Sequence, residues 1–151
     1  MLYRLLLIAL VAQALAAPAQ ERLTPAEVRG RVIYTTGQSA SGEPVAYRLL
    51  GAGDDVLLAK GVYCATCHGL DGKGGREGNM LAPDITLAAL TGEAALAKRN
   101  RAAYTEALLA RAITEGTDAS GHQLGSLMPR WALSTSELQD LLAYMKRLGA
   151  R

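Results

Sequence analysis

Phenylalanine is absent from the sequence, and six tyrosines and one tryptophan are its only aromatic residues. Charge is nearly balanced, with 16 lysines and arginines against 14 aspartates and glutamates. No strong field therefore points toward nucleic acid or an anionic membrane, and we expect no nucleic-acid partner. Two cysteines are too few for a scaffold of several disulfides. With only two histidines, a structural zinc site built from the protein alone would need all four of these side chains.

The 151 residues, half of them hydrophobic, suffice for one domain with a proper core and are too few for two. Because bulky aromatic rings are scarce, we expect a core of small aliphatic side chains. A large, flat, apolar bound group would add to the stability of such a core. The sequence shows no internal repeat, no flavin or nucleotide fingerprint and no catalytic acid–base pair. Any chemistry of this protein therefore depends on a small number of reactive or metal-binding side chains.

The first 16 residues resemble a secretory signal peptide. One positive charge precedes the apolar run 5–12, and residues 14–16 supply the small-x-small pattern that signal peptidase reads. We expect cleavage after Ala16, with a later site open at 17–19, and a single periplasmic domain over residues 17–151. The alternative is an uncleaved anchor, the one case in which we expect membrane contact. Its apolar run falls short of the ~20 residues that span a bilayer.

Capping signals mark the first and last helices of the mature chain. A helix over about 25–36 begins after Thr24, which has Glu27 three residues later. The last helix begins after Ser134, which forms a capping box with Glu137. Between them the sequence predicts, in chain order, a small hairpin over 44–63, a compact irregular loop without regular pairing over 69–78, short helices from Asp84 and over 93–100, a helix over 104–115 capped by Gly116, and a loop over 117–133.

Both cysteines belong to the run Cys64-Ala65-Thr66-Cys67-His68. At this spacing two thiols can add across the two vinyl groups of one haem, and the adjacent imidazole can ligate the iron. A thioredoxin-like dithiol is the main alternative, but it requires a βαβ unit that the helices and glycine loops do not provide. A zinc site would add His122, and the neighbouring Cys67 and His68 make a tetrahedral arrangement awkward. We therefore expect one haem c, covalently attached through Cys64 and Cys67.

From this motif onward the chain resembles a class I cytochrome c. His68 opens a run, residues 68–74, similar to the family's CHG-x-DG-x-G pattern. Residues 127–131, Leu-Met-Pro-Arg-Trp, resemble the family's sixth-ligand loop, and the last helix follows directly. The resemblance implies an all-α cytochrome c fold, with helices around one covalently bound haem.

The resemblance also implies roles for single residues. Met128 lies 60 residues beyond His68 and matches the sixth iron ligand, so the expected metal ligands are His68 and Met128. Pro83 matches the proline whose carbonyl accepts a hydrogen bond from the ligating histidine. Gly30 and Tyr34 match the glycine and aromatic residue of the first helix, where the last helix crosses closely.

One departure from the family pattern is the distance between Gly30 and Cys64, which is 34 residues. We interpret residues 38–61 as an insertion, a peripheral addition with a possible small β-hairpin that covers a haem edge or meets a partner. An alternative alignment takes residues 55–61 as the first helix, with Gly61 as its glycine.

Several residues near the site have a second interpretation. Met128 could be a core methionine, but it precedes a proline in a loop. His122 is the rival sixth ligand, although its position between glycines in a polar loop suits a solvated histidine. Trp131 packs on the haem, donates to a propionate or is buried in the core. The arginines that could bind a propionate are Arg76, Arg111 and Arg130, although a solvated surface position is the more usual state of any one of them.

A haem held by His68 and Met128 has no open position for a substrate, so it exchanges single electrons. We predict an electron-transfer protein rather than an enzyme, monomeric, that meets periplasmic redox proteins transiently. The first alternative is a dedicated cytochrome subunit of a periplasmic dehydrogenase or oxidase complex. The second is a haem sensor or peroxidase-like enzyme, which requires the methionine to be absent or labile.

Overall fold

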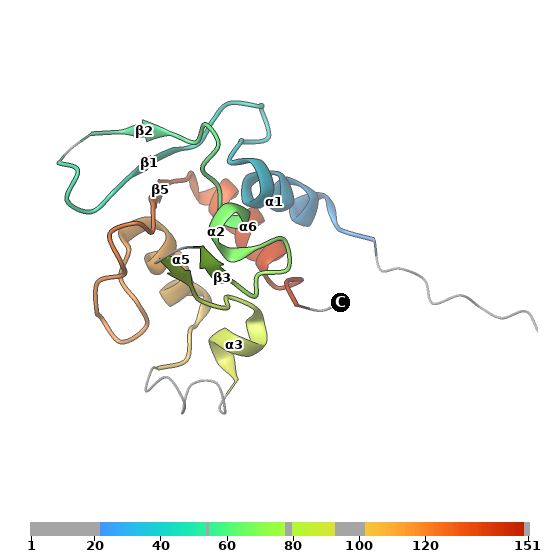
Figure 1. Cartoon of the computed structure of the whole chain (residues 1–151). Helices are drawn as coiled ribbons and strands as arrows, with labels where there is room; N and C mark the ends of the chain where they lie inside the picture. The colour runs from blue at the N-terminus through green and yellow to red at the C-terminus, as the bar shows by residue number, and fades with distance from the viewer. Residues whose placement is uncertain (1–21, 54, 78–79, 93–101, 150–151) are drawn as a thin grey trace, which may run out of the picture.

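The computed structural model describes residues 22–53, 55–77, 80–92 and 102–149. In Figure 1 the helices pack together in the middle of the molecule, and the hairpin formed by residues 46–58 lies above them. The described helices are α1 (Pro25–Thr36), α2 (Cys64–His68), α3 (Leu87–Thr91), α5 (Glu106–Glu115) and α6 (Thr135–Met145). The described strands are β1 (Ala46–Arg48), β2 (Leu57–Leu58), β3 (Gly75–Glu77), β4 (Met80–Ala82) and β5 (Arg130–Ala132). The expected signal peptide and the helix over 93–100 lie outside the described residues.

The predicted starts of α1 and α6 are confirmed. Thr24 accepts a hydrogen bond from the Glu27 amide, and the Glu27 carboxylate accepts one from the Thr24 amide at 2.6 Å. Ser134 and Glu137 form the same reciprocal pair at α6. Gly37 ends α1 with φ +68°, a conformation that costs glycine little. These ends were predictable because each depends on residues within one turn of the chain.

Helices α1 and α6 cross closely and form the centre of the molecule (Figure 1). A Cβ added at Gly30 would lie 1.9 Å from the Asp140 carbonyl oxygen, so the crossing requires glycine. Tyr34, one turn further, is fully buried, and its ring centroid lies 5.5 Å from that of Tyr144. Arg29 and Asp140 join the two helices by an ion pair of 2.6 Å.

The segment 38–61 forms the predicted hairpin but is not the peripheral addition that we expected. Strand β1 pairs antiparallel with β2 and also with β5, giving the order β2-β1-β5. Val45 and Tyr47 are buried in the main hydrophobic cluster, and Tyr47 packs on Trp131. The alternative first helix over 55–61 is wrong, because this segment holds β2, and open space surrounds Gly61.

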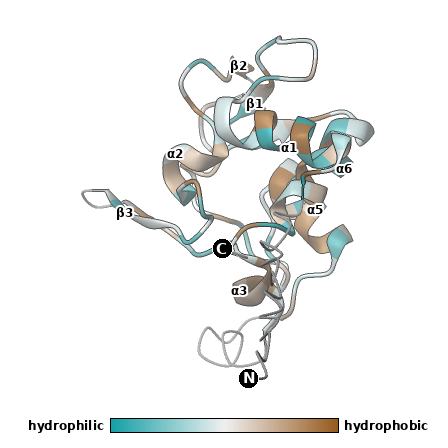
Figure 2. Cartoon of the chain, turned by 90° about the vertical axis from the view of Figure 1, so that its right-hand side faces the viewer, coloured by the Kyte–Doolittle hydropathy of each residue, from teal (hydrophilic) through white to brown (hydrophobic). Residues whose placement is uncertain are grey.

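The glycine-rich loop also differs from the prediction, because β3 and β4 pair antiparallel within and beyond it. Figure 2 shows their hairpin standing out from the body of the molecule. In the sequence, the dipeptide Gly-Asn at 78–79 is one that favours a two-residue hairpin turn, so a hairpin here could have been predicted. The fold is therefore helical, as expected, with two small sheets rather than all-α.

The remaining helices agree with the prediction in type. Helix α3 begins at Leu87, three residues later than expected, because Thr86 rather than Asp84 caps it. Helix α5 ends at Gly116, which has φ +71° and is its C-cap as predicted. The expected loop over 117–133 contains strand β5 at its end. Within the described residues, no helix is long and apolar enough to cross a membrane.

Candidate functional site

Both cysteines lie on α2, a helix of five residues that ends where Gly69 takes φ +75°. The two cysteines are three positions apart, about one helical turn, so their thiols project from the same side of α2. Both thiols are free of disulfides, and both residues are half-buried. Desolvation raises the pKa of the Cys64 thiol to about 12, so this thiol is neutral near pH 7.

His68 is the buried end of α2. Its Nδ1 lies 2.9 Å from the Pro83 carbonyl oxygen. Because a carbonyl only accepts, Nδ1 carries the proton and donates, which leaves the lone pair on Nε2. Burial lowers the pKa of His68, although the bond to Pro83 works in the opposite direction. The imidazole is thus held neutral, with one nitrogen available to a metal.

The segment that carries Pro83 lies against α2 because of Gly74. A Cβ at Gly74 would lie 2.2 Å from the Ala82 carbonyl oxygen and 2.6 Å from that of Pro83. The Gly74 amide also donates to the His68 carbonyl at 2.8 Å. Only glycine fits between these two backbones, so the loop glycines bring the proline to the histidine.

A buried hydrogen bond ties α2 to the helix crossing. The Tyr34 hydroxyl donates to the Gly69 carbonyl at 2.7 Å. Burial raises the pKa of Tyr34, so the phenol stays protonated and remains a donor. The helix that carries both cysteines and His68 is therefore fixed to α1 at its C-terminal end.

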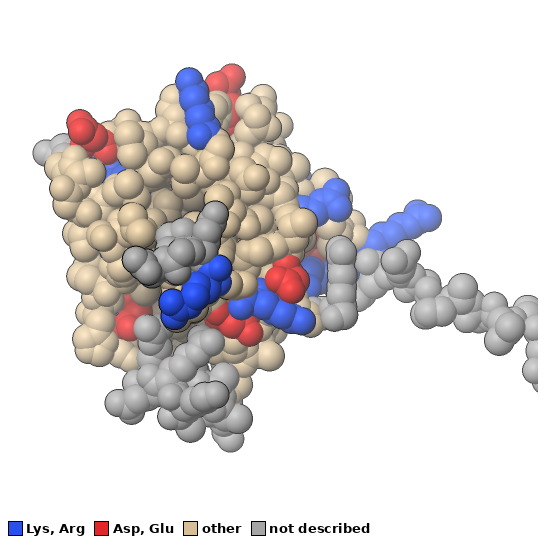
Figure 3. Space-filling model, in the orientation of Figure 1, with Lys and Arg blue, Asp and Glu red and all other residues tan. Residues whose placement is uncertain are grey.

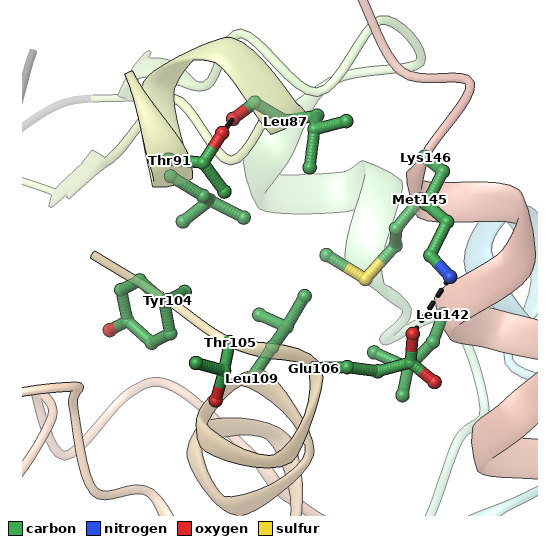
Figure 4. A pocket seen from close by; sticks show the side chains of 10 residues that line it. Leu87, Thr91, Tyr104, Thr105, Glu106, Leu109, Leu142, Met145 and Lys146 are labelled. Atoms are coloured by element: carbon green, nitrogen blue, oxygen red, sulfur yellow. Dashed lines mark hydrogen bonds and ion pairs between the residues drawn. The ribbon is translucent and has the colours of Figure 1, made fainter. Parts of the chain in front are cut away.

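A largely apolar cavity of about 120 Å³ lies between α3, α5 and α6 (Figure 4). Leu87, Leu109 and Met145 approach it from these three elements, and the Lys146–Glu106 ion pair of 2.7 Å lies beside it. Its volume is well below the ~300 Å³ at which small-molecule pockets begin, so it could enclose one edge of a large flat group rather than all of it. No residue that the sequence singled out as a ligand lines this cavity.

Met128 lies on the loop between α5 and β5. The residue is half-buried, its amide donates to the Gly125 carbonyl at 3.1 Å, and Pro129 behind it is buried. Arg130, which we considered as a propionate partner, instead donates to carbonyls of this loop, including that of Met128. Burial lowers the pKa of Arg130. The structure thus brings Cys64, Cys67, His68 and Pro83 together at α2. Met128 lies on a different loop, where its carbonyl accepts from Arg130.

Other candidates have ordinary surroundings. Trp131 is buried in β5 with its ring centroid 5.1 Å from that of Tyr47, a core position. The His122 side chain is 79% exposed and lies 3.6 Å from Asp118, which is the solvated position that its sequence context suits. No cluster of three or more His, Cys, Asp or Glu suited to a metal ion occurs among the described residues, so the zinc interpretation has no support.

One buried donor lacks an acceptor among the described side chains and backbone groups. Arg111 donates to the Asp118 carbonyl at 2.7 Å through Nη2, while its Nε is buried without a partner there. A buried donor of this kind is costly unless something accepts from it. A carboxylate of a bound group could do so, as the sequence suggested for this arginine.

The side chains present fit a covalently bound haem. Two cysteine thiols on one helical turn, in no disulfide, match the two vinyl groups, and a neutral buried imidazole offers Nε2 to the iron. The thioether of Met128, on a separate loop, offers a soft, uncharged sulfur. Apolar side chains from three helices line the one cavity described above.

Comparison with known protein families also supports a covalently bound haem. The family model described as Cytochrome c matches residues 56–149, more than half of the chain. The match begins beyond α1 and β1, so these two elements lie outside it although α1 packs on α6. Neither the comparison with curated proteins nor that with solved structures found a match. The chain belongs to the Cytochrome c family, whose members transfer electrons, and it binds haem c covalently through Cys64 and Cys67.

Proposed function

We propose that this protein is a periplasmic one-electron carrier whose haem iron is held between His68 Nε2 and Met128 Sδ. The observation that carries the proposal is the bond from His68 Nδ1 to Pro83, which leaves Nε2 free in a buried, neutral ring. When bound, the haem supplies the reversible iron(III)/iron(II) couple. Everything else in electron transfer depends on how the chain holds and encloses it.

The roles of the chain's own residues follow from their chemistry. Cys64 and Cys67 attach the group to α2, and Pro83 orients the imidazole of His68. Met128 adds an uncharged soft ligand, which favours the reduced state relative to a second histidine. The half-buried Met128 suits this role better than the exposed side chain of His122. With both axial positions filled, no substrate reaches the iron, and the sensor or peroxidase alternative would require the methionine to dissociate.

The surface supports transient partners without strong charge steering. On the face turned toward the viewer in Figure 3, charged side chains of both signs are scattered and partly adjacent, with no cluster of one sign. The net charge of +2 agrees with this view. We infer a monomer that meets periplasmic redox proteins over a small interface, with weak dependence on ionic strength. Residues 1–16 would direct export of the single domain 17–151.

A dedicated cytochrome subunit is the second candidate, and one observation favours it. Three apolar side chains of the β1–β2 hairpin are about half exposed: Leu50 (50%), Val56 (55%) and Leu58 (48%). Single exposed leucines are ordinary, but three on one short hairpin suit a contact with a larger catalytic chain. Co-purification of such a chain with the native protein would favour this candidate.

The ligand assignment is tested by comparing two variants. Met128→Ala should open the iron to carbon monoxide and cyanide and should lower the reduction potential, because axial ligand identity tunes haem over about 0.8 V. His122→Ala, the matched control on the same loop, should leave the low-spin spectrum unchanged. The reverse result, loss of that spectrum in His122→Ala alone, would identify a His68/His122 pair and reject the high-potential carrier.

A further inference from the structure

The loop that carries Met128 is held together by one side chain. Arg130 donates from Nη1 to the carbonyls of Met128 and Gly125, the latter at 3.0 Å. Its Nη2 donates to the Leu124 carbonyl at 3.0 Å and makes two longer contacts of 3.5 Å. The acceptors, in chain order, are oxygens of Gly116, Gln123, Leu124, Gly125 and Met128. One guanidinium therefore reaches both ends of the loop and its ligand residue.

The backbone of Arg130 is fixed independently of the loop. Arg130 is the first residue of β5, which pairs in register with β1, so that Arg130 lies opposite Arg48 and Trp131 opposite Tyr47. The buried contact between the Trp131 and Tyr47 rings anchors this pairing in the core. The guanidinium thus extends from a strand that is held in the core, and its hydrogen bonds attach the loop to that strand.

The end of α5 leaves room for the guanidinium. A Cβ at Gly116 would lie 2.0 Å from Nε of Arg130 and 2.3 Å from its Cζ. The arginine head therefore packs directly on the C-cap of α5, in the space that a side chain would fill. Glycine at this position allows the left-handed backbone conformation and also leaves the space that the Arg130 guanidinium occupies.

We propose that Arg130 is a positioning residue for the sixth iron ligand, which closes the loop 116–128 and sets how readily Met128 leaves the iron. The proposal rests on ligation by Met128, as proposed above. A shift of the Met128 backbone would carry the sulfur away from the iron and make way for another ligand. That motion breaks the bonds from Arg130 to the carbonyls of Met128 and Gly125. The Gly125 carbonyl also accepts from the Met128 amide, so both sides of the turn are coupled to one cation.

The test is the rate at which imidazole replaces Met128 in the ferric holoprotein. At saturating imidazole this rate is limited by dissociation of the sulfur, and it is followed by loss of the absorption band of the iron(III)–sulfur bond. Arg130→Gln should raise the limiting rate about tenfold to a hundredfold, the effect of losing charge-assisted hydrogen bonds. Arg48→Gln is the matched control, because it removes the same charge from the exposed residue opposite in the sheet, and it should not change the rate.

A second variant separates geometry from charge. Arg130→Lys keeps the positive charge but loses the planar fork that reaches several carbonyls at once. It should retain the native reduction potential while its imidazole rate rises, whereas Arg130→Gln should also lower the potential, because a cation near the iron disfavours the ferric state. If Arg130→Gln yields no holoprotein, the rate in Arg130→Lys decides in its place.

The outcomes distinguish this proposal from the ligand assignment. An imidazole rate in the Arg130 variants equal to that in Arg48→Gln would overturn the role of Arg130, while the native iron–sulfur band would still support Met128. Absence of that band from the native ferric protein would instead reject Met128 as the ligand and the positioning role with it.

Discussion

The chemistry of the site depends on which nitrogen of His68 carries the proton. The Pro83 carbonyl settles this, since it accepts from Nδ1 at 2.9 Å and leaves Nε2 with its lone pair. The desolvation that lowers the pKa of His68 acts in the same sense, because a protonated ring could not bind iron. A carbonyl and a buried position thus prepare the ligand before any metal contributes.

At the residue scale, sequence patterns found the residues whose chemistry is local and missed those whose partners are distant. Cys64, Cys67 and His68 form one short run, so their joint role is readable from their spacing. Arg130 was expected to be solvated or to bind a propionate. Its actual acceptors come from several parts of a folded loop, and no spacing rule shows which carbonyls will converge on one guanidinium.

Cys64→Ser and Cys67→Ser should each reduce the yield of holoprotein, and the double variant should abolish it. Each thiol makes one bond that no neighbour can replace, because the chain has no third cysteine. The measurement is the haem absorbance that stays with the protein through acid–acetone extraction. Thr66→Ala, a change at the exposed residue between the cysteines, is the control and should leave the yield unchanged.

Retention of a normal, extraction-resistant haem spectrum by the double cysteine variant would contradict covalent attachment at α2. A wild-type protein that is colourless and catalyses thiol exchange would point instead to the dithiol alternative. The two measurements together distinguish covalent haem attachment from the dithiol alternative.

At the scale of elements, the ends of α1, α5 and α6 that carry capping signals and the β1–β2 hairpin were predictable, whereas the pairing of β1 with β5 was not. The capping boxes at Thr24 and Ser134 and the C-cap at Gly116 act within one turn, so the sequence carries the full signal. The pairing of β1 with β5 joins segments far apart in the chain. Strands of three residues show too little alternation of polar and apolar residues to predict such a pairing. The pairing depends instead on the burial of Tyr47 against Trp131.

This pairing makes the hairpin a structural support of the loop that carries Met128. Strand β1 holds β5, and β5 begins two residues after Met128. Deleting residues 38–61 would therefore expose Trp131 and free the strand that carries Arg130, so we do not expect the haem spectrum to survive that deletion. A smaller change tests the same connection more cleanly.

Tyr47→Ala should destabilise the folded protein by about 3 kcal/mol, because it removes a buried aromatic ring and leaves a cavity beside Trp131. Urea unfolding of the holoprotein, followed by circular dichroism, measures this free energy. Leu50→Ala, at a half-exposed position on the same hairpin, is the control and should change the free energy of unfolding by less than about 0.5 kcal/mol. Equal, small effects of both changes would show that the hairpin is peripheral after all.

At the scale of the whole molecule, the distribution of charge limits how partners can be recognised. The face turned toward the viewer in Figure 3 carries scattered charges of both signs, and the balance of the chain is +2. Partners selected mainly by charge would need a patch of one sign, which this face does not present. The composition alone indicated this outcome, since nearly equal numbers of acidic and basic residues rarely leave one large field.

Covalent haem attachment also places a requirement on where the whole molecule matures. Residues 1–16 have the charge, apolar run and small-residue pattern of a secretory signal, and c-type haem is attached after translocation. A chain that lacks residues 1–16 should therefore stay in the cytoplasm with Cys64 and Cys67 unmodified. Cell fractionation, followed by measurement of extraction-resistant haem on the recovered protein, tests this expectation. The control joins residues 17–151 to an unrelated signal peptide and should restore both export and haem. Covalent haem on the truncated cytoplasmic chain would show that residues 1–16 are dispensable for maturation and would remove the main support for a periplasmic carrier.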